Sequence, residues 1–112
     1  MKHYPLLLAK DIKTEEKMDV VAPYDLSVIA TIDCASELHI QQALKTAHQC
    51  YKNRSEWLST PKRIEILERV VVLMSEQHDK LALASAHEGG KPLMDSLAEV
   101  TRAIDGIKIC IE

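Results

Sequence analysis

Three cysteines, Cys34, Cys50 and Cys110, are the strongest potential nucleophiles in this sequence. A cysteine attacks as the thiolate, which forms readily at helix starts or beside basic groups. Only Cys34 has such a position, just before an expected helix, whereas Cys50 and Cys110 fall among apolar residues of expected helices. Because the cysteines are odd in number and lack CxxC spacing, we predict buried reduced thiols, with Cys50 and Cys110 in the core, and no catalytic cysteine.

Cys34 and Cys50 bracket two histidines, His39 and His48, so the four side chains are candidate metal ligands. A structural zinc site needs four ligands that converge on one point. His48 and Cys50 are two residues apart on one expected helix and therefore face different ways. We interpret the histidines as surface residues and expect no metal bound by these side chains.

Two pairs of carboxylates at helical spacing, Glu65 with Glu68 and Asp95 with Glu99, are candidates for acid–base chemistry. Such a role requires an enclosed site that tunes the acid for proton transfer. Both pairs fall on the polar faces of expected helices, which favours solvated charge. Arg102 lies three residues after Glu99, so we predict an ordinary surface ion pair between them.

A glycine-rich stretch, HEGGKP at residues 87–92, predicts a hinge between two helices. Glycine adopts the left-handed conformation that ends many helices, and we assign that role to Gly90, with Gly89 as the alternative. Pro92 suits the first turn of the next helix. A phosphate-binding loop is excluded because Ser85 stands where the motif needs glycine and Pro92 where it needs Ser or Thr.

A long amphipathic helix is predicted from Pro92 to the end of the sequence. Its apolar residues recur alternately every four and every three positions, which is the helical period. The stripe consists of Leu93, Leu97, Val100, Ile104, Ile107 and Ile111.

The residues before the hinge predict a small sheet followed by further helices. Apolar stretches at 4–9, 18–22 and 28–32 indicate short strands, with a turn at 23–27. A helix capped by Ser36 should run to about Asn53, and a second should be capped by Thr60, with Pro61 as its first residue. A break near His78 should separate the second helix from a third. The sequence therefore predicts an α+β fold, with a β-meander over residues 1–34 and three or four helices over residues 35–112.

The overall composition indicates an ordinary globular chain. The 112 residues are 46% hydrophobic and carry a net charge of −3 with acids and bases interspersed. No basic face points to nucleic acid, no apolar run is long enough for a membrane helix, and no signal peptide is recognisable. We expect a cytoplasmic protein with neither nucleic acid nor membrane as a partner.

Several short sequence motifs, and their order along the chain, resemble the N-terminal segment of the aldehyde dehydrogenase superfamily. The most specific motifs are EGGKPL at residues 88–93, like the family's ETGKP, and EV-RAID at residues 99–105. The stretch VVAPYD at residues 20–25 is similar to the family's NP turn, with Ala22 in place of Asn. Trp57 and the PKR start at residues 61–63 also match. The resemblance covers nearly the whole sequence.

The resemblance implies an N-terminal part, residues 1–112, of the cofactor-binding domain of an enzyme that oxidises a small aldehyde with NAD or NADP. In that family a cysteine thiolate attacks the aldehyde, hydride passes to the cofactor and a glutamate activates water. These residues come later in family members, so the resemblance implies an inactive, architectural segment that binds no cofactor alone. It also implies a monovalent cation held by a carbonyl of Val20 or Val21 and by Glu99.

The expected partners are the rest of such an enzyme or other copies of the chain, in a homo-oligomer. The last helix carries Ile107, Cys110 and Ile111 in its final turns without a glycine cap, which predicts an exposed apolar patch and self-association. A free-standing helical protein-interaction module is the alternative.

Overall fold

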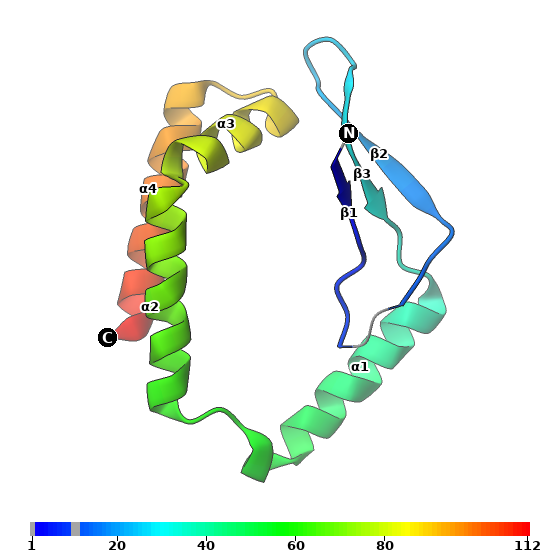
Figure 1. The fold of residues 1–112 in the computed structure, drawn as a ribbon, viewed down its shortest axis with the longest axis vertical. Coiled ribbons are helices and arrows are strands. Elements are labelled where there is room, and N and C mark those ends of the chain that lie inside the picture. The colour runs from blue at the N-terminus through cyan, green and yellow to red at the C-terminus, as the bar shows by residue number, and fades with distance from the viewer. Residues whose placement is uncertain (1, 10–11) are drawn as a thin grey trace. The chain divides into compact units, whose positions relative to one another are not determined.

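The protein is described by a computed structural model that covers residues 2–9 and 12–112. It forms two compact units that are interleaved along the chain. Unit 1 comprises Met1–Val21 and Leu26–Trp57, and unit 2 comprises Ala22–Asp25 and Leu58–Glu112. The α+β fold class is confirmed, with a small sheet preceding four α-helices (Figure 1).

Unit 1 contains a sheet of three strands, β1 (Lys2–Tyr4), β2 (Lys17–Val21) and β3 (Val28–Asp33). The strand order is β1-β3-β2, with β1 parallel and β2 antiparallel to β3. The predicted meander is therefore wrong in detail, because a meander pairs consecutive strands and keeps them all antiparallel. The first strand also ends at Tyr4 and does not extend to Ala9, since Pro5 has no N–H to continue a ladder.

The helix of unit 1, α1 (Glu37–Lys52), begins where the sequence predicts. Ser36 accepts a hydrogen bond from the His39 amide, and the His39 side chain accepts one from the Ser36 amide. Both amides would otherwise lack partners at a helix start. None of the residues of α1 is buried.

A short 3-10 turn, η1 (Arg54–Glu56), follows α1 and leads to Trp57. The Trp57 indole Nε1 donates to the Cys50 carbonyl at 2.9 Å. Tyr51 and Arg54 lie against the same ring. Trp57 thus closes the end of α1, while its ring remains about half exposed.

Unit 2 contains α2 (Thr60–Glu76), α3 (His78–Gly89) and α4 (Leu93–Ile111). Ser59, rather than Thr60, caps α2, because its hydroxyl accepts from the Lys62 amide. The break between α2 and α3 falls at Gln77, as expected near His78. In Figure 1, α4 runs beside α2 in the opposite direction.

The core of unit 2 lies between these three helices. Its buried members are Ala82 of α3 with Val100 and Ile104 of α4, and the partly buried Val71, Met74 and Leu97 pack against them. The middle of the predicted apolar stripe of α4 therefore packs against α2 and α3. Leu93, at the start of the stripe, is 45% exposed. Burying a side chain the size of valine or isoleucine contributes about 1.5–3 kcal/mol, so this contact fixes α4 in place.

Candidate functional site

The hinge between α3 and α4 has the geometry that its glycines predict. Gly90 has φ of 62° and ψ of 25°, in the left-handed region, and ends α3. Gly89 is still helical. Pro23, from the segment Ala22–Asp25 of the same unit, lies directly against Gly90. The hinge therefore requires glycine at position 90 for both its backbone conformation and its close contact.

Lys91 leaves this hinge and pairs with Glu99. Its Nζ donates to Glu99 Oε2, eight residues along the chain and within α4. Its methylene stem passes Gly89, where an added Cβ would lie 3.9 Å from Lys91 Cγ and Cε. The expectation that Glu99 would pair with Arg102 is not what the structure shows: the partner is Lys91. Sequence spacing within one helix gives no sign of this contact, because Lys91 lies before the helix starts.

The other predicted cation ligands, Val20 and Val21, lie at the end of β2 in unit 1. Val20 pairs with Ala30 and Val21 with Val28, so the ladder is irregular between them. Glu99 belongs to unit 2. The cation role of the three residues stays a prediction. Within residues 2–9 and 12–112, no three His, Cys, Asp or Glu side chains come together as a metal cluster.

The cysteines are reduced but less buried than predicted. Cys50 and Cys110 are exposed, and Cys34 is partly buried. The core assignment of Cys50 and Cys110 is therefore wrong in this chain, because helical periodicity identifies an apolar face but not what covers it. The Cys34 amide donates to the Glu16 carbonyl at 2.9 Å. For none of the three does the described part of the chain show a side-chain base in hydrogen-bond contact.

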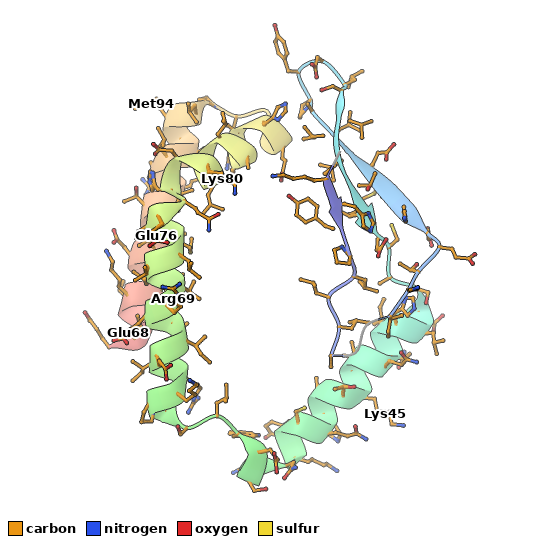
Figure 2. The ribbon with its side chains drawn as sticks, viewed as in Figure 1. Lys45, Glu68, Arg69, Glu76, Lys80 and Met94 are labelled. Atoms are coloured by element: carbon orange, nitrogen blue, oxygen red, sulfur yellow. The ribbon has the colours of Figure 1, made fainter. Side chains whose placement is uncertain are left out.

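The remaining chemical candidates have structural roles. His39 caps α1 and His48 is exposed on it, so they do not form the metal site considered above. Glu65 accepts from Lys62 at 2.9 Å, and Glu68 is exposed on α2 (Figure 2). These carboxylates are solvated charges, as predicted.

A polar cluster at the start of α3 was not anticipated from the sequence. His78 Nε2 lies 3.0 Å from Thr101 Oγ1 of α4, and His78 Nδ1 lies 2.9 Å from Asp79 Oδ1. Thr101 also donates to the Leu97 carbonyl at 3.1 Å. A shallow cavity of about 230 Å³ adjoins these groups. Since the contact between His78 and Thr101 joins α3 to α4, we interpret the cluster as a set of polar contacts that stabilises the packing of these two helices.

A second polar cluster lies in unit 1 and joins the parallel strands β1 and β3. The His3 ring lies 3.0 Å from Thr31 Oγ1 and 3.2 Å from Asp33 Oδ1. The Asp33 carboxylate is only 9% exposed, and its other oxygen accepts from the Leu6 amide at 3.4 Å. These contacts hold the edge strand β1 to β3, and Lys13 and Lys17 line the adjoining cavity of about 490 Å³.

Neither the hinge before α4 nor the start of α1 has the free amides that a cofactor phosphate usually binds. A cofactor phosphate is usually bound by free amides at a glycine-rich helix start. The hinge places Pro92, which has no N–H, at that position, and the first turn of α4 carries the acidic Asp95. The start of α1 carries Glu37, and its His39 amide already bonds to Ser36.

Comparison with known proteins identifies the family. The model of the aldehyde dehydrogenase family matches residues 10–112. Lactaldehyde dehydrogenase of Methanocaldococcus jannaschii is 35% identical over 94 residues, which is 84% of this chain and 20% of that protein. The chain therefore belongs to the aldehyde dehydrogenase family. It spans about a fifth of the length of the curated relatives that it matches.

Solved structures agree with this assignment. Aldehyde dehydrogenase 21 from Physcomitrella patens, in complex with the reaction product succinate, matches 98% of this chain with a TM-score of 0.87 and 28% identity. Glyceraldehyde-3-phosphate dehydrogenase GapN from Methanocaldococcus jannaschii, complexed with NADP, matches 89% with a TM-score of 0.77 and 34% identity. The chain covers 23% and 22% of these two structures.

Proposed function

We propose that this chain is the N-terminal part of an NAD(P)-dependent aldehyde dehydrogenase that oxidises a small aldehyde to its acid. The observation that carries the proposal is the family match over residues 10–112. All 112 residues form one N-terminal segment of the cofactor-binding domain, within which the two compact units are substructures.

The segment serves as architecture and supplies no reacting group. The cysteines at 34, 50 and 110 have no side-chain base against them among the described contacts, and a nucleophilic thiol needs such a partner or an equivalent electropositive site. When the full enzyme binds NAD or NADP, the cofactor accepts hydride, but the hinge with Pro92 and Asp95 does not cradle its phosphates. The role of these residues is to present the faces of α1, α2 and α4 to the rest of the protein.

A small aldehyde is the substrate class that the relatives support. The names of those relatives include lactaldehyde dehydrogenase and malonate-semialdehyde dehydrogenase, and one solved structure holds succinate. A second solved structure is complexed with NADP. These names support a small aldehyde as the substrate of the whole protein, and the NADP-bound structure supports a nicotinamide cofactor as the acceptor.

The partners of the chain are the rest of the enzyme or further copies of itself, in a cytoplasmic homo-oligomer. Large apolar side chains on α1 and α4 are open to solvent in the described residues. Single chains usually cover such patches, so their exposure supports a covering partner. None of the described helices has the length and apolarity to cross a membrane. The exposed side chains are Leu38, Ile40, Leu44 and Tyr51 on α1, and Met94 (Figure 2) and Ile109 on α4.

The proposal is tested first on the isolated chain. Purified protein is incubated with lactaldehyde, malonate semialdehyde or succinate semialdehyde and with NAD or NADP, and absorbance at the reduced-nicotinamide band is followed. We expect no reduction. Reduction that disappears in Cys34→Ala would refute the architectural role.

Sedimentation of the same sample distinguishes this proposal from the alternative, a free-standing helical interaction module. If the chain is part of a dehydrogenase, we expect self-association at micromolar concentration and binding of a hydrophobic dye. A monomer that binds no dye would favour the module.

A further inference from the structure

The carboxylate of Glu99 already has a positively charged partner within unit 2. Lys91 Nζ donates to Glu99 Oε2, and the Lys91 side chain is only one-third exposed. Its stem is held over Gly89, where an added Cβ would be in van der Waals contact with three of its carbons. The ammonium therefore lies beside the Glu99 carboxylate, at a side chain that the hinge partly covers.

This arrangement does not fit a monovalent cation at the same carboxylate. An alkali ion binds where carboxylate and carbonyl oxygens face it and where no other positive charge is adjacent. An ion in contact with Glu99 would lie within a few ångströms of the Lys91 ammonium, and the two like charges would repel.

We propose that the Lys91 ammonium supplies the positive charge at Glu99, in place of the monovalent cation that the family resemblance implies. Lys91 thus links the hinge to the second turn of α4 through its ion pair with Glu99. The stability of unit 2 should respond to salt as an ordinary ion pair does, with no preference for sodium or potassium. This inference concerns stability, so its outcome is independent of whether the chain is part of a dehydrogenase.

A double-mutant cycle tests the pair. Lys91→Met retains the stem over Gly89 and removes the charge, and Glu99→Gln retains the shape and removes the opposite charge. We expect the two substitutions to couple, with the pair worth a twofold to fivefold change in the unfolding equilibrium constant at low salt. High salt should reduce the coupling. Additive effects at low salt would overturn the proposal.

A matched cycle at Lys108 and Asp105 provides the control. Their side chains pair at 3.0 Å, three residues apart on α4 and away from the hinge. This cycle reports the ordinary salt response of an exposed pair on the same helix.

Changing the cation of the salt tests the same proposal on the unsubstituted protein. Thermal unfolding is followed by circular dichroism in sodium, potassium or tetramethylammonium chloride at equal ionic strength. We expect the same midpoint in all three salts. A higher midpoint that is specific to sodium or potassium, saturates with concentration and is absent in Glu99→Gln would overturn the proposal.

Discussion

Replacing Gly90 tests the hinge most sharply, because two independent features of the structure require glycine there. Its φ of 62° lies in the left-handed region, which costs a residue with a side chain about 1–2 kcal/mol. A Cβ at this position would also lie 3.1 Å from Pro23 Cβ and 3.2 Å from Pro23 Cγ. Both distances are shorter than ordinary carbon–carbon contacts, so the Pro23 segment would have to shift.

The expected loss follows from these two features. Gly90→Ala should destabilise unit 2 by about 1–2 kcal/mol from the backbone alone. Gly90→Val adds methyl groups toward Pro23, and overpacking of that kind costs about another 1–2 kcal/mol. In a chain of this size each kcal/mol corresponds to about 3–6 °C in the unfolding midpoint.

Denaturant unfolding of the variants, followed by circular dichroism, provides the assay. Gly89→Ala and Gly106→Ala are matched controls, since the first is helical with ordinary space for a Cβ and the second has open space around it. Both controls should be neutral or stabilising by up to about 1 kcal/mol. Gly90→Asn should fall between glycine and alanine, because asparagine tolerates the left-handed region.

If Gly90→Ala unfolds at the same denaturant concentration as the parent, position 90 does not require glycine. If Gly89→Ala loses stability and Gly90→Ala does not, the left-handed role belongs to Gly89. If Gly90→Asn loses as much stability as Gly90→Ala, the loss comes from the contact with Pro23 and not from the backbone conformation.

Two further predictions concern single side chains. Ser96 is fully buried, and its Oγ has no hydrogen-bond partner among the described residues, so Ser96→Ala should stabilise the chain by about 1 kcal/mol in the same assay. Ser75→Ala, at an exposed helical site where the hydroxyl is bonded to a backbone carbonyl, should gain no more than about 0.5 kcal/mol from helix propensity, and equal gains in both variants would contradict a cost of burial at Ser96. Ser36→Ala removes the cap of α1 and should cost about 1 kcal/mol, seen as faster amide exchange in the first turn of that helix. Unchanged exchange there would show that the cap contributes nothing.

The helix boundaries were largely predictable because their signals are local. Ser36 and Gly90 act through hydrogen bonds and backbone conformation within a few residues of themselves. Periodicity likewise placed Val100 and Ile104 on the buried face of α4. Such signals require no knowledge of the tertiary structure.

The sheet order and the site contacts were not predictable for the opposite reason. The strand β1 has three residues, and its parallel pairing with β3 joins residues 28 positions apart. The partner of Glu99 is a lysine outside the helix, whereas spacing within the helix favours Arg102. Cys50 lies on an apolar helical face that remains exposed, because periodicity does not say whether another element covers that face.

Transplanting the chain into an active relative tests whether these residues supply only the architecture of the enzyme. In lactaldehyde dehydrogenase of Methanocaldococcus jannaschii, the 94 aligned residues are replaced by their counterparts from this chain, with Cys34, Cys50 and Cys110 changed to alanine. Steady-state oxidation of lactaldehyde is then measured. We expect the chimera to oxidise lactaldehyde, and we expect Gly90→Val to lower the thermal stability of the chimera. A chimera that folds and assembles like the parent but has no turnover would contradict an architectural role without catalytic cysteines.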